Sequence, residues 1–167
     1  VKKDASVKRI QLNGVSVKLT VDGSVGTLVV AETSTFTIKG SQDKLSIVVS
    51  ENAAGSKIES KIPVSVTTAA DIEITLKKGA ENSVITMDSN DIVASVDNQT
   101  TGNVVVIDAE GSKEEIEPGQ NVTTDTIGDG KNDDDAKNND DAKENEADNK
   151  DNTGTSNGGS TGGTSGG

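Results

Sequence analysis

The chain of 167 residues contains no cysteine and no histidine, and Phe36 is its one aromatic residue. Without Cys and His, disulfides, thiolate or imidazole metal sites, cysteine nucleophiles and imidazole bases are excluded. Without Trp and Tyr, sugar binding by stacking on exposed rings is disfavoured. The core therefore has to be built from Val, Ile and Leu, each of which contributes about 1.5 to 3 kcal/mol when fully buried.

Positive charge is scarce as well. The net charge is −12, with 16 Lys and Arg against 28 Asp and Glu. Residues 1–120 carry a net −5 and residues 121–167 a net −7, so the shorter C-terminal part holds most of the excess. An acidic chain without a basic stripe is repelled by phosphate backbones, and by anionic lipid surfaces for the same reason. We expect no nucleic-acid binding and no binding to anionic membranes.

Long hydrophobic runs are missing too. No stretch approaches the roughly 18 apolar residues that span a bilayer, so we expect no membrane insertion. We expect no signal peptide in these residues, because a strand-like pattern begins already by Val7. We expect the chain to be a part cut from a longer precursor.

Short runs in which aliphatic and polar residues alternate fill the first 120 positions. This period of two is the signal of β-strands, and about ten short strands are expected. Turn residues, often Gly after Asn, Asp or Lys, separate the runs. The alternating apolar positions are Val15, Val17, Leu19 and Val21; Leu28 and Val30; Phe36 and Ile38; Leu45, Ile47 and Val49; Ile62, Val64 and Val66; Ile72, Ile74 and Leu76; Val84 with Met87; Val104 and Val106; and Ile116.

Irregular structure is expected at 31–35 and 50–60, and helix content should be low. Ser89-Asn90-Asp91 is the one place where a single helical turn could be capped. Toward residue 120 we expect a closing hairpin of 103–108 with 114–117, followed by a turn at 117–120. Strands of four to six residues at this spacing suit a sandwich, a barrel or a stacked solenoid.

Two segments carry a resemblance to a known family. The run from Val15 to Glu59, VSVKLTVDGSVGTLVVAETSTFTIKGSQDKLSIVVSENAAGSKIE, resembles the right-handed parallel β-helix segments of Firmicute cell-surface and S-layer-associated proteins. The run from Thr100 to Val122, TTGNVVVIDAEGSKEEIEPGQNV, looks like the hairpin that ends such segments ahead of a low-complexity linker. The resemblance covers about residues 7–123. It implies an all-β fold, a short right-handed parallel β-helix or β-solenoid with a closing hairpin; the alternative is a bacterial immunoglobulin-like β-sandwich.

Three segments follow from the composition. Residues 1–122 form the predicted β-rich domain, 123–151 an acidic disordered linker, and 152–167 a flexible linker rich in Gly, Ser and Thr.

The acidic segment resembles, with a poor fit, the calcium loops of thrombospondin-type and EF-hand proteins. A solvated spacer is the favoured interpretation, and weak calcium binding is the alternative. The candidate ligands are Asp125, Asp129, Asp133 and Asp135.

Catalysis by paired carboxylates is the hydrolytic mechanism that this composition leaves open. Asp71 and Glu73 have strand-like spacing, but they alternate with Ile72 and Ile74, so they are expected on a solvent face rather than in an active site. The sequence therefore predicts no enzyme, no catalytic residue and no cofactor. Asn98 and Asn121 match the glycosylation acceptor pattern, which matters only in a eukaryotic secretory pathway.

The expected function is that of a non-enzymatic structural or spacer module of a secreted bacterial cell-surface protein. The alternative is an adhesin or polysaccharide-binding module that uses a polar sheet face or the loop at 50–60. Expected partners are other modules of the same surface protein or cell-wall components, and the expected location is the extracellular surface or cell wall of a Gram-positive bacterium.

Overall fold

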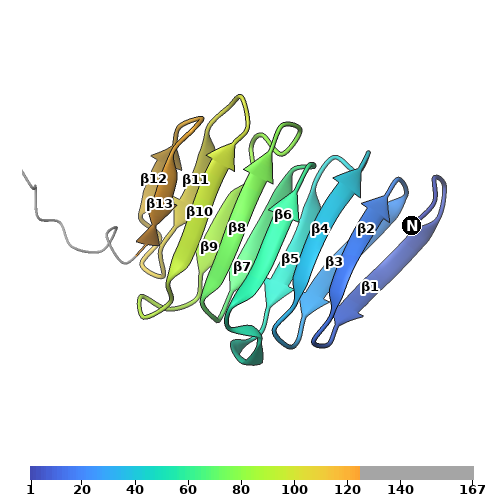
Figure 1. Cartoon of the computed structure of the whole chain (residues 1–167), viewed down its shortest axis with the longest axis horizontal. Coiled ribbons are helices and arrows are strands. Elements are labelled where there is room, and N and C mark those ends of the chain that lie inside the picture. The colour runs from blue at the N-terminus through green and yellow to red at the C-terminus, as the bar shows by residue number, and fades with distance from the viewer. Residues whose placement is uncertain (125–167) are drawn as a thin grey trace, which may run out of the picture. The chain divides into compact units, whose positions relative to one another are not determined.

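The structure, a computed structural model, describes residues 1–124, and these form thirteen strands and one short 3₁₀ helix (Figure 1). From β1 to β11, odd-numbered and even-numbered strands lie in two separate sheets; β12 joins the odd-numbered strands and β13 the even-numbered ones. Sheet A has the order β1-β3-β5-β7-β9-β11-β12 and sheet B the order β13-β10-β8-β6-β4-β2. The bounds are β1 Ser6–Leu12, β2 Ser16–Val21, β3 Ser24–Val30, β4 Thr35–Gly40, β5 Leu45–Val49, η1 Glu51–Ala53, β6 Ser56–Ser60, β7 Val64–Thr68, β8 Ile72–Lys77, β9 Val84–Met87, β10 Ala94–Gln99, β11 Val104–Ile107, β12 Lys113–Ile116 and β13 Asn121–Thr123.

The chain winds as a β-solenoid of about five turns, each made of one strand in sheet A and one in sheet B. Successive turns pair in parallel in both sheets, as for β3 with β5 and β4 with β6. The two antiparallel pairs lie at the C-terminal end, where β12 folds back on β11 and β13 on β10. The predicted solenoid with its closing hairpin is confirmed, and the β-sandwich alternative is wrong.

The length of a turn varies along the solenoid. Residues that pair across neighbouring turns are separated by 16 positions at Ser56 and Ile72, and by 22 positions at Ile72 and Ala94. Surface turns absorb the difference while the strands keep their register. The chain therefore stacks regularly without an exact sequence repeat.

The core lies between the two sheets and consists of stacked aliphatic rows. In sheet A, Leu28, Ile47 and Val66 occupy equivalent places in successive turns, and each is at most 1 % exposed. In sheet B, Phe36, Ile58 and Ile74 form the matching row. Each strand presents every second residue to this core because side chains alternate between the faces of a sheet.

Buried polar side chains occupy the corners, where the chain passes from one sheet to the other. Ser56 Oγ accepts a hydrogen bond from Ser34 N at 3.0 Å and donates one to Ala53 O at 2.6 Å. Asn98 Nδ2 donates to Gly102 O and Ile116 O. In the described part of the chain, every buried side-chain nitrogen or oxygen has a partner. These bonds satisfy backbone groups that the turns would otherwise leave unpaired.

Three details differ from the sequence expectations. Segment 50–60 is not irregular throughout, since its second half is strand β6 and its first half holds η1. In β9, Ile85 and Met87 face the core while Val84 faces outward, so the register expected from Val84 is wrong. Residues 88–91 form a turn and no helix. In β9 two adjacent apolar residues, Val84 and Ile85, hide the alternation, and in β6 the buried residues Ser56 and Ser60 do so.

Candidate functional site

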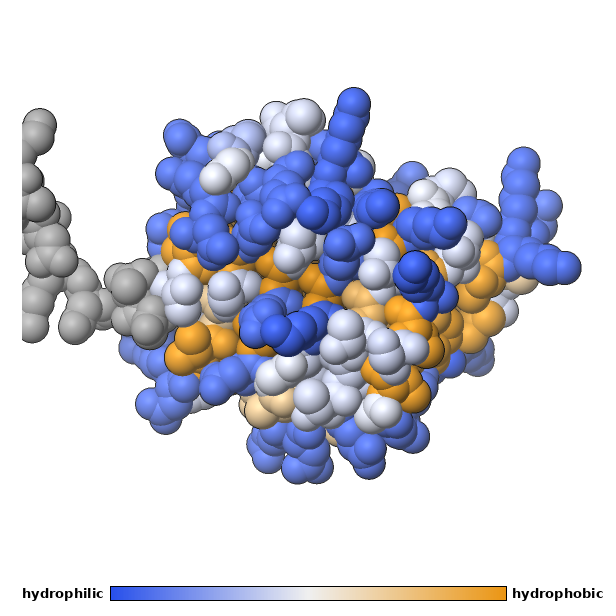
Figure 2. All heavy atoms as spheres, viewed as in Figure 1, coloured by the Kyte–Doolittle hydropathy of each residue, from blue (hydrophilic) through white to orange (hydrophobic). Residues whose placement is uncertain are grey.

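The outer face of sheet B is the strongly charged face of the solenoid. Its side chains point away from the core on strands β2, β4, β6, β8 and β10, and many of them are long and ionised. In the view of Figure 2 hydrophilic residues are interspersed with apolar ones over the visible face. The outward charged residues on the strands of sheet B are Lys18, Lys39, Lys57, Glu59, Glu73, Lys77 and Asp97, and Lys61 follows directly after β6.

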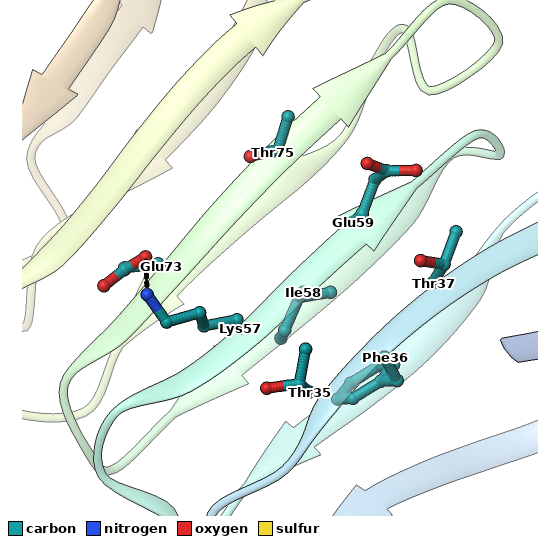
Figure 3. A pocket seen from close by; sticks show the side chains of 8 residues that line it. All are labelled: Thr35, Phe36, Thr37, Lys57, Ile58, Glu59, Glu73 and Thr75. Atoms are coloured by element: carbon teal, nitrogen blue, oxygen red, sulfur yellow. Dashed lines mark hydrogen bonds and ion pairs between the residues drawn. The ribbon is translucent and has the colours of Figure 1, made fainter. Parts of the chain in front are cut away.

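Two shallow hollows lie side by side on this face, with volumes of about 240 and 400 Å³. Both are bordered by Thr37 and Glu59, so together they form one groove across neighbouring strands. The floor of the smaller hollow is made by Phe36 and Ile58, whose side chains are each 2 % exposed (Figure 3). The ring of Phe36 therefore belongs to the core and offers no platform for a sugar.

One wall of the smaller hollow is fixed by an ion pair. Lys57 Nζ lies 2.7 Å from Glu73 Oε2, across strands β6 and β8 (Figure 3). Both side chains are more than half exposed, at 57 % and 59 %. Exposed pairs of this kind contribute about 1 kcal/mol or less, so the bond orients the two side chains more than it stabilises the fold.

The larger hollow is bordered by three lysines from successive turns, Lys18, Lys39 and Lys61. Lys61 N donates to Ile38 O at 2.9 Å, which places Lys61 beside Lys39 in the ladder. Within residues 1–124 none of the three makes an ion pair or a side-chain hydrogen bond with another residue. Glu59 also borders this hollow, but three lysines against one carboxylate leave its lining positive, so the groove favours an anionic group.

These lysines were not predicted from the sequence. They stand 21 and 22 positions apart, and no local pattern links them. Only the parallel register of β2, β4 and β6 brings them together. The one available signal was position: Lys39 directly follows the alternating pair Phe36 and Ile38, and Lys61 directly precedes the run that begins at Ile62.

Asp71 and Glu73 lie on the solvent face, as expected. Asp71 Oδ1 accepts a hydrogen bond from Val93 N at 2.7 Å, and Glu73 holds Lys57. Both carboxylates thus join neighbouring turns. Their geometry is that of ladder contacts between coils rather than of a pair facing a shared substrate.

Glu81 links two turns at the opposite corner of the solenoid. Its carboxylate accepts hydrogen bonds from Gly79 N, at 3.0 and 3.2 Å, and from Thr101 Oγ1 at 3.0 Å. Hydrogen bonds from its own backbone N–H, from Gly79 and from Thr101 lower the pKa of Glu81, against a smaller opposing effect of burial. The ionised carboxylate is therefore part of the stacking contact.

The two glycosylation patterns differ in their surroundings. Asn98 is fully buried and its amide is engaged in the corner bonds described above, so it is closed to modification. Asn121 lies exposed on β13.

The calcium candidates Asp125, Asp129, Asp133 and Asp135 lie outside the described residues, as do the two predicted linkers. Within residues 1–124, no three Asp or Glu side chains converge closely enough to hold a metal ion. Calcium binding by the acidic segment stays a prediction. Nor does any helix among residues 1–124 have the length and apolar character to cross a bilayer.

Comparison with known proteins gives no match to a protein-family model, a curated protein or a solved structure. Function therefore has to be argued from the solenoid and its surfaces.

Proposed function

We propose that this chain is a non-enzymatic structural module, a short stalk or spacer in a secreted bacterial cell-surface protein. The observation that carries the proposal is the uninterrupted stack of aliphatic rows, closed at one end by the antiparallel strands β12 and β13. Such a stack holds its two ends at a fixed separation, because each turn adds one strand spacing of about 4.8 Å.

Further support comes from the way three acidic side chains are used. Asp71, Glu73 and Glu81 each bond to a neighbouring turn, so they serve the stacking. Together with the resemblance of 15–59 to Firmicute surface segments, this favours an extracellular location on a Gram-positive cell. The partners would be other modules of the same protein or cell-wall components.

Location and mechanics can be tested separately. Antibodies raised against the chain should label intact cells of the source organism; labelling only after permeabilisation would contradict a surface location.

In single-molecule pulling from residue 1 to residue 167, the solenoid should resist force and then lengthen in steps. A chain that extends smoothly without a force peak would contradict a load-bearing spacer.

A second candidate, a polysaccharide-binding module, is favoured by Lys18, Lys39 and Lys61 along the groove of sheet B, which form no ion pair with any of residues 1–124. Their charges suit an acidic wall polysaccharide. In a glycan-array assay the triple variant Lys18→Ala, Lys39→Ala, Lys61→Ala should lose at least tenfold in affinity. The matched control, with Lys2, Lys3 and Lys8 changed to Ala, removes the same charge at another place. Equal loss of affinity in both variants would show that net charge alone explains the binding, and it would reject the groove as the binding site.

A further inference from the structure

The outer face of sheet A differs from that of sheet B because it carries no charged residue on its five central strands. Four of these strands direct two side chains outward and β3 directs three, and all eleven are Ser, Thr, Val or Ile. On the strands of sheet B the outward positions include seven charged residues. The uncharged positions of sheet A are Ser24, Thr27 and Val29 on β3, Ser46 and Val48 on β5, Ser65 and Thr67 on β7, Val84 and Thr86 on β9, and Val105 and Ile107 on β11.

The strand register arranges these residues in straight rows. Val29, Val48 and Thr67 lie directly beside one another on β3, β5 and β7. Val48, at the middle of this row, is 39 % exposed and is the one large apolar residue with that much exposure among residues 1–124. Short, mostly β-branched side chains of similar height make a flat surface. A flat face of this kind suits packing against another sheet, at a separation of about 10 Å.

Charges return only at the two ends of this face. Arg9 projects outward on β1, and Lys113 and Glu115 project outward on β12, at the opposite end of sheet A. Arg9 donates to Gln11 Oε1 at 3.2 Å, and Glu115 accepts from Asn103 at 2.9 Å; within residues 1–124 neither forms an ion pair with an opposite charge.

We propose that the outer face of sheet A is the interface of a homodimer. The same face of a second copy packs against it, and the solenoid axes of the two copies run in opposite directions. The two-fold axis lies parallel to the strands near β7. It places β1 of each copy over β12 of the partner, so that Arg9 faces the partner's Glu115 at both ends. The uncharged rows of the two copies meet in the middle.

Charge and area both favour a second copy as the occupant. Each copy carries a net −12, so copies can approach only through a surface that lacks negative charge, and sheet A provides it. With seven strands of about five residues, the face measures roughly 30 by 17 Å, or about 1,000 Å² for both copies together. That area lies at the lower limit for a specific interface, so the dimer is expected to be weak, with a Kd in the micromolar range or above.

The first test is the oligomeric state of the full chain. Sedimentation velocity from about 1 µM to 1 mM should show a reversible monomer–dimer equilibrium. Thr67→Lys places a charge at the centre of the face and should abolish the dimer. Thr75→Lys, the matched control, adds the same charge to the outer face of sheet B and should leave it unchanged. Circular dichroism and thermal melting would establish that both variants fold.

The second test concerns the orientation of the two copies. Arg9→Glu should weaken the dimer at least tenfold, because it brings two carboxylates together at each end. The double variant Arg9→Glu, Glu115→Arg should restore it. A monomer up to 1 mM, or a dimer that Thr67→Lys and Thr75→Lys affect equally, would overturn the proposal. A dimer sensitive to Thr67→Lys without rescue by the double variant would overturn the antiparallel arrangement. None of these results depends on the chain being a surface spacer.

Discussion

Gly79 shows how a single turn residue controls the approach of two coils. Its φ is +101°, and a Cβ at this position would lie 2.5 Å from Lys61 O of the preceding turn. Gly111 in the closing hairpin has a similar φ of +87° but no atom within 4 Å of such a Cβ. The two positions therefore share the cost of a left-handed backbone and differ in the steric clash.

Replacing each glycine by alanine separates these two effects. We expect Gly111→Ala to lower the free energy of unfolding by about 1 to 2 kcal/mol, from the backbone conformation alone. Gly79→Ala should lower it by a further 1 to 3 kcal/mol or so, because the added methyl group forces β6 and β8 apart. Urea denaturation of both variants measures the difference. Equal losses would show that the turn accommodates the methyl group without moving the coils.

The carboxylate of Glu81 predicts a dependence of stability on pH. Its pKa is lower in the folded chain than in the unfolded one, so its contribution is present above the unfolded value and lost as the pH falls through the folded value. We expect Glu81→Gln to lower the melting temperature at pH 7 by a few degrees at most, since the group is partly exposed. The difference from the parent chain should shrink below about pH 4. A difference that stays constant from pH 7 to pH 3 would contradict a role for the charge.

At the scale of the strand, alternation decides which residue matters. On β5, Ile47 is fully buried between Leu28 and Val66, while its neighbour Ser46 is exposed on the outer face. Ile47→Ala should cost about 2 to 5 kcal/mol of unfolding free energy, because the strands on both sides hold the cavity open. Ser46→Ala should change it by less than about 0.5 kcal/mol. Chemical denaturation gives both values, and similar losses would contradict the register of β5.

The strands themselves were largely predictable from this alternation, and the exceptions have a physical cause. The alternating residues of β2, β4, β5, β7 and β8 were assigned to the correct face. In β9 the apolar residues Val84 and Ile85 are adjacent, and only packing shows that Ile85 is the buried one. Strand β6 was overlooked because its inward positions include Ser56 and Ser60, whose hydroxyl groups are satisfied at the corners. A serine in a sequence indicates a loop more often than a buried strand position, and only the hydrogen-bond partner of its hydroxyl group shows that it can be buried.

For the whole molecule, the excess of acid predicts a response to salt. Residues 1–120 carry a net −5 and the full chain −12, so compact states are destabilised by repulsion between like charges. We expect the melting temperature of the full chain, at low micromolar concentration, to rise by a few degrees between about 10 and 150 mM NaCl, as the Debye length falls toward 8 Å. Equal concentrations of KCl should give the same rise. A fall with salt would mean that attractive pairs such as Lys57 with Glu73 dominate the electrostatics.

The sequence by itself determined that the chain is all-β, that its core is aliphatic, and that a hairpin closes the ordered pattern near residue 120. These properties follow from composition and from contacts between neighbours in the chain. The sequence left the sandwich and the solenoid open, because strand pairing depends on contacts 16 to 22 residues apart with no fixed repeat. Only the tertiary structure decided that the pairs are parallel. The same pairing gathered Lys18, Lys39 and Lys61 into one groove and left the outer face of sheet A without charge on its five central strands, since each surface combines residues from every turn.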